Sequence, residues 1–275
     1  MPEKLGIIAG GGSLPKQLIS RCRQEGRPYA LVCLKGHALP QTAEGEDFLW
    51  VRLGEAGKAI SYFKKNGVRQ IVMIGGVKRP SLLQLRPDLW TAKFLFKIGF
   101  KAFGDDNLLK LVIKGFEDEG FKIIGFHEIM TDLLAEEGVW GKVQPDEQAQ
   151  ADINHGVKIA LGLGALDVGQ SVVVQQGIVL GVEAVEGTDA LIKRCKDLKR
   201  EGAGGVLVKT KKPQQEQRAD LPTVGVQTVL NAYEAGLRGI AVQAGKTLVA
   251  DRAGIITKAD ELGLFVVGVN CDDAG

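Results

Sequence analysis

Acidic residues in the second half of the chain stand where they could hold a metal ion beside a phosphate. Asp189 forms a group with Glu183 and Glu186 after a predicted strand. Asp220 lies in a polar loop, and Asp251 precedes a predicted helix. Carboxylates that converge from separate loops can hold Mg²⁺, which neutralises phosphate oxygens and activates a bound water. Spacing alone does not show convergence, so helix caps and ion pairs remain the alternative.

Basic residues surround the polar loop 211–222, which reads KKPQQEQRADLP and is the longest hydrophilic stretch of the chain. Cations are expected where negative charge develops on phosphate oxygens. The candidates that flank Asp220 are Lys209, Lys211, Lys212 and Arg218. Ordinary solvation of a loop is the alternative.

Two glycine turns each follow a predicted strand. Gly10, Gly11 and Gly12 precede a helix that begins near Ser13, and such a turn offers backbone N–H groups to a phosphate. The pattern is neither the GxGxxG fingerprint nor a P-loop, and a tight turn without a ligand is the alternative.

The second glycine turn consists of Gly75 and Gly76, followed by Lys78 and Arg79. In a parallel sheet both turns would lie at the carboxyl edge, where ligands bind, so together they suggest a site for a nucleotide diphosphate. Lys78 and Arg79 could equally be a solvated pair.

The segment 82–103 is largely apolar, except for a stripe of Lys93, Lys97 and Lys101 at helical spacing. It fits a core helix or dimer contact as well as a surface that meets acyl chains and anionic headgroups. Asp105 and Asp106 follow it, and they could cap the next helix or hold a metal or substrate.

The elements that must position these residues alternate between short apolar runs and helical patterns. Strands at 4–9, 28–34 and 70–75, with helices at 13–25 and 55–65, are typical of parallel βαβ units. The second half is again α/β and includes a predicted hairpin. We predict an α/β protein with a Rossmann-like parallel-sheet domain over 1–133, a linker over 134–141, and a distinct α/β catalytic domain over 142–275.

Composition narrows the class of protein. The 275 residues carry a net charge of +2, which does not favour a nucleic-acid partner. The four cysteines show no CxxC spacing, and the three histidines form no catalytic pattern. With no signal peptide and no apolar run long enough to span a bilayer, we expect a cytoplasmic protein whose membrane contact is peripheral.

Five stretches, spread over nearly the whole chain, carry a resemblance to a known family: IIAGGGSLP at 7–15, IGGVKRPSL at 74–82, FGDDNLL at 103–109, VLGVEAVEGTDALI at 179–192 and RADLPTVGVQTV at 218–229. In order and spacing they resemble the LpxI family of UDP-2,3-diacylglucosamine pyrophosphatases. The resemblance implies a two-domain enzyme of Gram-negative lipid A synthesis, with the lipid substrate between a Rossmann-like domain and an α/β domain.

The resemblance also implies a reaction. Mg²⁺-dependent hydrolysis of UDP-2,3-diacylglucosamine would give UMP and 2,3-diacylglucosamine 1-phosphate (lipid X), with water attacking the phosphorus on the sugar side. The family's important aspartate falls at Asp220, and Asp189 matches as a further metal ligand. A homodimer in peripheral contact with the inner membrane is expected.

Taken together, the catalytic candidates are Asp220, Asp189 and Lys209, of which the two aspartates are the candidate metal ligands. The substrate-binding candidates are the glycines of both turns together with Ser13, Lys78, Arg79, Asp105, Asp106, Glu186, Thr188, Arg218 and Thr223.

Two other functions remain open from the residues alone. The first is a nucleotide-sugar or dinucleotide-binding oxidoreductase, which is weakened because no acidic residue closes the strand 28–34. The second is a lipid-binding module that uses the segment 82–103.

Overall fold

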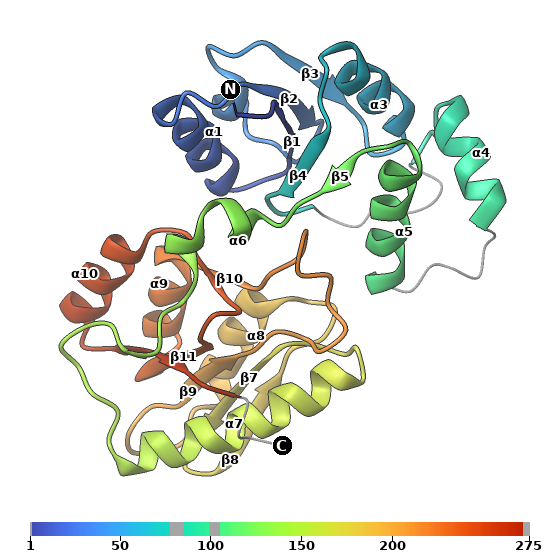
Figure 1. Cartoon of the computed structure of the whole chain (residues 1–275). Coiled ribbons are helices and arrows are strands. Elements are labelled where there is room, and N and C mark those ends of the chain that lie inside the picture. The colour runs from blue at the N-terminus through green and yellow to red at the C-terminus, as the bar shows by residue number, and fades with distance from the viewer. Residues whose placement is uncertain (1, 78–84, 99–104, 272–275) are drawn as a thin grey trace. The chain divides into compact units, whose positions relative to one another are not determined.

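The computed structural model describes residues 2–77, 85–98 and 105–271, and the chain divides into two compact units (Figure 1). The first unit contains Met1–Met130 and Glu216–Asp220, and the second contains Thr131–Gln215 and Leu221–Gly275. Residues 134–141, predicted as a linker, lie inside the second unit. There Gly138–Val139 forms β6, which pairs antiparallel with β13 (Phe265–Val269).

The first unit contains a parallel sheet of five strands in the order β3-β2-β1-β4-β5. This is the strand order of a doubly wound α/β sheet, so the predicted parallel α/β class is confirmed. The residues of β1 are all buried, as a sheet covered on both faces requires. The strands are β1 (Leu5–Ala9), β2 (Tyr29–Leu34), β3 (Phe48–Val51), β4 (Gln70–Ile74) and β5 (Lys122–Ile123).

Helices of the first unit bury their apolar sides against this sheet. Ile60 and Phe63 of one helix and Ile113 and Phe116 of another join Val32 in a single core cluster. The helices are α1 (Leu14–Gln24), α2 (Pro40–Ala43), α3 (Ala56–Lys65), α4 (Leu89–Ile98), α5 (Asp105–Asp118) and α6 (Phe126–Ile129). The strand predicted over 121–126 is shorter than expected, because α6 begins within it.

The second unit contains a mixed sheet of six strands in the order β6-β13-β11-β9-β7-β8. β9, β11 and β13 are parallel, while β7 and β8 form the predicted antiparallel hairpin. A separate parallel pair joins β10 to β12. The remaining strands are β7 (Ser171–Gln175), β8 (Ile178–Val182), β9 (Val206–Lys209), β10 (Thr223–Val224), β11 (Gly239–Gln243) and β12 (Leu248–Val249).

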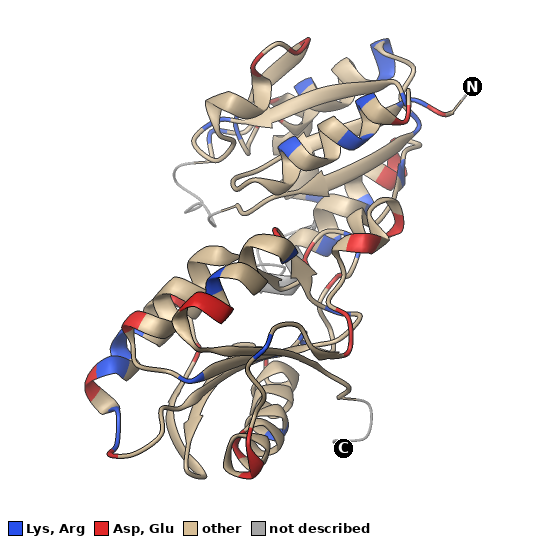
Figure 2. Ribbon diagram, turned by 90° about the vertical axis from the view of Figure 1, so that its left-hand side faces the viewer, with Lys and Arg blue, Asp and Glu red and all other residues tan. Residues whose placement is uncertain are grey.

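Helices cover both faces of the six-stranded sheet. On one face α7 packs Ile153 and Val157 against Val172 and Val208. On the other face three helices bury a second cluster around Leu207. The helices are α7 (Glu147–Ala165), α8 (Thr188–Cys195), α9 (Val226–Glu234) and α10 (Arg252–Leu262), with 3₁₀ turns at Thr131–Leu133 and Lys196–Leu198. Basic and acidic residues are interspersed on the helices of both units, in keeping with the small net charge (Figure 2).

The apolar segment 82–103 forms a shorter helix than predicted. Within its described part, α4 spans Leu89–Ile98; residues 99–104, including Lys101 of the stripe, lie outside the described residues. Trp90 and Phe94 stack with ring centroids 5.1 Å apart and lie over Gly115 of α5, so this side of α4 is a packing contact. Phe96 is 92% exposed, and Lys93 and Lys97 are also exposed.

No helix in the described part of the chain combines the length and apolar character needed to cross a membrane.

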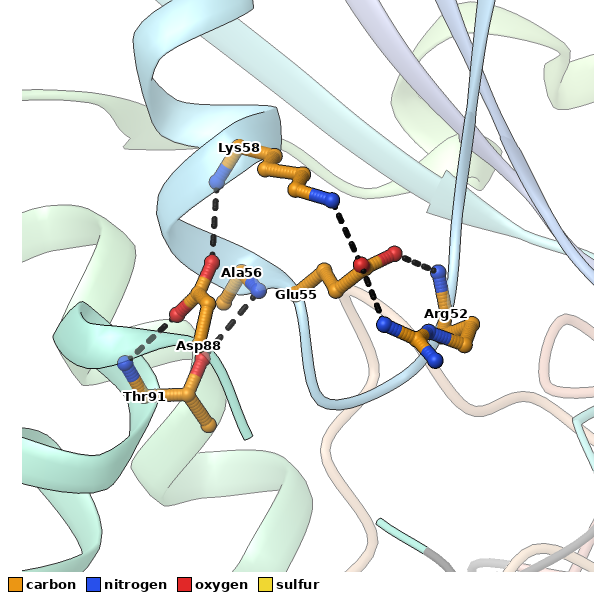
Figure 3. Close-up of polar contacts among 6 residues, drawn as sticks. All are labelled: Arg52, Glu55, Ala56, Lys58, Asp88 and Thr91. Carbon is orange, nitrogen blue, oxygen red and sulfur yellow. Dashed lines mark hydrogen bonds and ion pairs between the residues drawn. The ribbon is translucent and has the colours of Figure 1, made fainter. Parts of the chain in front are cut away.

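A buried carboxylate joins the start of α3 to the loop before it (Figure 3). Glu55 accepts hydrogen bonds from the Arg52 side chain at 2.7 Å, from Lys58 Nζ at 2.6 Å and from the Arg52 N–H at 2.8 Å. Beside it, Asp88 accepts from the N–H groups of Lys58 and Thr91, and thereby ties α4 to α3. Above all the Arg52 guanidinium, and then Lys58, lower the pKa of Glu55 from 4.5 to about 2.

We expect the stabilising effect of Glu55 to disappear in acid. Because its folded pKa lies below its unfolded pKa, the carboxylate stabilises the fold above about pH 4.5, and this contribution is lost as the pH falls toward about 2. The free energy of unfolding of Glu55→Gln should therefore lie below that of wild type at neutral pH, with the gap narrowing at about pH 3. Urea unfolding at both pH values measures the gap, and a gap independent of pH would refute this account of Glu55.

Candidate functional site

The two glycine turns lie side by side at one edge of the first unit's sheet, as the sequence analysis expected. β1 and β4 are parallel neighbours, and the turns that follow them join through a bridge between Gly11 and Gly76. The Gly11 N–H donates to Gly76 O at 2.8 Å, and the Gly76 N–H donates to Gly11 O at 3.0 Å. The two turns are therefore joined to each other by two hydrogen bonds at the carboxyl edge of this sheet.

Most amides of these turns are used within the protein. Besides the two bonds of the bridge, the Gly10 N–H donates to Ile74 O at 2.8 Å. Gly12 has a φ of 88°, and a Cβ at this position would meet nothing within 4 Å. Ser13 follows as the N-cap of α1. The phosphate-binding hypothesis is thus narrowed to the amides of Gly12, Ser13 and the first turn of α1, where the helix dipole favours an anion.

Close backbone contact gives Gly10 and Gly75 a structural reason to be glycine. A Cβ on Gly10 would lie 2.7 Å from Gly75 O, and one on Gly75 would lie 2.5 Å from Gly11 O. Gly75 also has a φ of 96°, a conformation that side chains disfavour.

We expect Gly75→Ala to lower the free energy of unfolding by about 2–3 kcal/mol, because it combines positive φ with a backbone clash. Gly76→Ala is the matched control, since a Cβ there meets nothing within 4 Å. Chemical denaturation of both variants measures the difference. Equal stability of the two would show that the clash is relieved at no cost.

Four other candidates of the first domain are not tested by side-chain geometry. Lys78 and Arg79 lie outside the described residues. Asp105 and Asp106 form the first turn of α5, but their side chains lie outside the description.

A buried polar cluster lies at the edge of the second unit's sheet where β9 ends. We use this name for Ser171, Glu183, Thr188 and Lys209. Ser171 opens β7 and pairs in register with Lys209 at the end of β9. The Glu183 N–H donates to Ser171 O at 2.8 Å, which places Glu183 beside them just after β8. Thr188 is the first residue of α8.

Hydrogen bonds connect all four side chains of the polar cluster. Lys209 Nζ donates to Thr188 Oγ1 at 3.0 Å and to Thr223 O at 3.2 Å. Thr188 Oγ1 lies 3.2 Å from Ser171 Oγ and donates to Glu183 Oε1 at 3.3 Å. Lys209 and Glu183 are each only 7% exposed. The cluster holds an ammonium group where low polarity strengthens its attraction for an anion.

Asp189 follows Thr188 in the first turn of α8 and is exposed. Its Oδ1 accepts a hydrogen bond at 2.8 Å from Asn231 Nδ2 on α9. The structure thus brings Lys209, Thr188 and the Thr223 carbonyl into contact in the second unit, and Asp189 follows Thr188 on α8 with its side chain bonded to Asn231. Neither Ser171 nor Asn231 was a sequence candidate; the signal for Ser171 was a polar residue opening an apolar strand.

Glu186 has a structural partner in the same loop. It forms an ion pair with Arg194 at 3.1 Å and accepts from the Ala184 N–H at 3.1 Å. Backbone hydrogen bonding, and next the bond from Arg194, lower the pKa of Glu186. Its predicted contact with substrate gains no support from this geometry.

Asp220 belongs to the other unit, which corrects the expectation that it is part of the second domain. The segment Glu216–Asp220 groups with the first unit. Arg218 bonds to Glu216 at 2.9 Å and to Glu117 of α5 at 2.7 Å, and Ala219 packs on the first unit's core. Hydrogen bonding from Arg218 lowers the pKa of Glu216. Asp220 is half-exposed at the end of this anchored segment.

Asp251, the third acidic position, is the N-cap of α10. Its side chain accepts from the Gly254 N–H at 2.9 Å and is exposed. Capping of α10 therefore explains why an aspartate occupies position 251.

The donor groups fit a magnesium ion that arrives with a phosphate. Within the described ranges, no three His, Cys, Asp or Glu side chains form a group that could hold a metal. Mg²⁺ commonly binds through one or two carboxylates together with water and substrate phosphates, and so needs no preformed cage. The exposed carboxylate of Asp189 and the half-exposed one of Asp220 are hard oxygen ligands of this kind.

Comparisons with known proteins give the same family for both halves of the chain. The model of the LpxI N-terminal domain matches residues 4–133, and the model of the LpxI C-terminal domain matches residues 136–267. The chain is 44% identical over 277 residues to the UDP-2,3-diacylglucosamine pyrophosphatase LpxI of Caulobacter vibrioides, with 98% of each chain covered.

Proposed function

The chain belongs to the LpxI family, and we propose that it hydrolyses the pyrophosphate bond of UDP-2,3-diacylglucosamine to UMP and lipid X in lipid A synthesis. The observation that carries the proposal is the 44% identity to the Caulobacter enzyme over 98% of both chains. The alignment therefore spans nearly the whole length of the relative.

The residues of each unit have chemistry that suits this reaction. In the first unit, the amides of Gly12 and Ser13 at the start of α1 bind phosphate oxygens. In the second unit, the Lys209 ammonium neutralises charge that develops on the diphosphate, and Thr188 and Thr223 hold it in place. Asp220 orients and activates the attacking water.

Mg²⁺ is the cofactor in this proposal, with Asp189 and Asp220 as its protein ligands. When bound, the ion neutralises phosphate oxygens and lowers the pKa of a coordinated water. The support for it is the exposed oxygen chemistry of these two carboxylates and the polyanionic substrate.

The test is hydrolysis by the purified protein. Incubation with UDP-2,3-diacylglucosamine and Mg²⁺ should give UMP and lipid X in equal amounts. Chelation with EDTA should stop the reaction, and added Mg²⁺ should restore it. Release of UDP, or an intact substrate under all conditions, would contradict the proposal.

Peripheral membrane contact through α4 is part of the proposal, as is a homodimer. The exposed Phe96 would enter the interface, with Lys93 and Lys97 near anionic headgroups. We expect Phe96→Ser to weaken binding to anionic phospholipid vesicles by about tenfold. Leu166→Ser removes an exposed leucine of the second unit and is the control. Co-flotation measures binding, and equal flotation of wild type and Phe96→Ser would exclude this contact.

A further inference from the structure

Glu183 is a buried acid whose hydrogen bonds are incomplete. Its side chain is 7% exposed, and its Oε2 atom has no hydrogen-bond partner among the residues that the structure describes. Burying a carboxylate with one oxygen unpaired costs free energy. Stability of the fold therefore does not explain why an ionisable side chain occupies this position.

The direction of the hydrogen bonds shows what Glu183 does. The Thr188 hydroxyl has a single proton, and it donates this proton to Glu183 Oε1. Thr188 Oγ1 then has its lone pairs left to accept from Lys209 Nζ and from Ser171 Oγ. Glu183 thus fixes the rotation of this hydroxyl and turns its accepting side toward Lys209.

The sheet places these groups in one layer. Ser171 and Lys209 are register partners on neighbouring strands, so their side chains point to the same face. That face is covered by α8, since Leu191 and Ile192 of α8 share a core cluster with Leu207, two residues before Lys209 on β9. Thr188 at the start of α8 therefore bridges the carboxylate and the ammonium.

We propose that Glu183 is a positioning residue for the hydrolysis, which acts through the Thr188 hydroxyl to hold the Lys209 ammonium in its working place. The inference rests on the proposed function and adds a residue to it. In the buried cluster the carboxylate also attracts the ammonium across the hydroxyl, because low polarity leaves their charges weakly screened. Glu183 itself contacts neither the substrate nor the reacting atoms in this scheme.

The experiment compares steady-state hydrolysis of UDP-2,3-diacylglucosamine by the full-length wild type and three variants of the polar cluster. Glu183→Gln keeps the shape and removes the charge. Thr188→Val removes the bridging hydroxyl, and Thr188→Ser restores it. Glu136→Gln is the control, because this glutamate is exposed and its ion pair with Arg252 lies on the surface. Circular dichroism and thermal unfolding establish that each variant is folded.

We expect Glu183→Gln and Thr188→Val each to lower kcat by roughly 10- to 100-fold with KM changed by less than about threefold. Thr188→Ser should recover most of kcat, and Glu136→Gln should match wild type. A double variant that combines Glu183→Gln with Thr188→Val should be no slower than the slower of the two single variants, because both changes break one link.

Three results would overturn the inference. An unchanged kcat in folded Glu183→Gln shows that the charge has no role, while the proposed function stands. Failure of Thr188→Ser to recover above Thr188→Val shows that the hydroxyl is not the link. A wild type that releases no UMP refutes the proposed function, and the role of Glu183 falls with it.

Discussion

Asp220→Asn is expected to lower kcat for UMP release by about 10²- to 10⁴-fold while leaving the fold intact. The amide has the shape of the carboxylate but cannot accept a proton, and it is a poorer ligand for Mg²⁺. The segment that carries Asp220 is anchored through Arg218, which bonds to Glu117 and Glu216, and through Ala219, which packs against the core. The position of residue 220 should therefore survive the substitution.

The matched control is Asp146→Asn, because asparagine serves as well as aspartate at the N-cap of α7. Its kcat should equal that of wild type. Single-turnover measurement of UMP release separates chemistry from product release. If Asp220→Asn retains more than about a tenth of the wild-type rate, its carboxylate does not activate the water.

Lys209→Met should lower kcat by about 10²- to 10³-fold, the second large effect that we expect. Methionine fills the volume of the lysine stem but has no charge to place against the diphosphate. Lys209 is 7% exposed, and its ammonium donates to Thr188 and to the Thr223 carbonyl, so the charge is held at one position that is largely shielded from water. Loss of the buried ammonium leaves Glu183 without its opposite charge and should lower the stability of the fold, so kcat is compared only for variant protein that unfolding measurements show to be folded.

Lys209→Arg should not restore activity. The guanidinium is planar and larger than an ammonium group. It does not fit the position in which one ammonium donates to both Thr188 Oγ1 and the Thr223 carbonyl. The rate of UMP release and the thermal unfolding midpoint are to be measured for both variants. A folded Lys209→Met with wild-type kcat would remove Lys209 from the reaction.

The parallel sheet of the first unit was predictable because its strands are short apolar runs bounded by glycines. Since β1 and β4 are parallel, the position of both glycine turns at one edge followed directly. Their internal pairing did not, because no sequence pattern indicates that Gly11 and Gly76 bond to each other. Strand β3 was missed, since FLWV is short and mostly only half-buried.

The polar cluster was only half predictable. Lys209 was a candidate as a cation flanking Asp220, and Thr188 as part of the stretch 179–192. Ser171 was not a candidate, because its role depends on strand register. The sequence also did not show that Asp220 belongs to the first unit. This placement depends on the ion pair between Arg218 and Glu117, which are 101 residues apart in the chain. Contacts of this range leave no periodic signal in a sequence.

The segment 82–103 shows which features of a helix the spacing of its residues can predict. Its spacing predicted a helix with a basic stripe, and α4 has exposed Lys93 and Lys97. Periodicity could not separate the apolar residues that pack on α5, Trp90 and Phe94, from the exposed Phe96. That distinction depends on the position of the neighbouring helix.

Hydrolysis in ¹⁸O-labelled water, followed by mass spectrometry of both products, tests the central claim most directly. If water attacks the diphosphate at the phosphorus on the sugar side, the label appears in the 1-phosphate of lipid X and UMP remains unlabelled. Label in UMP, or release of UDP in place of UMP, would contradict the account.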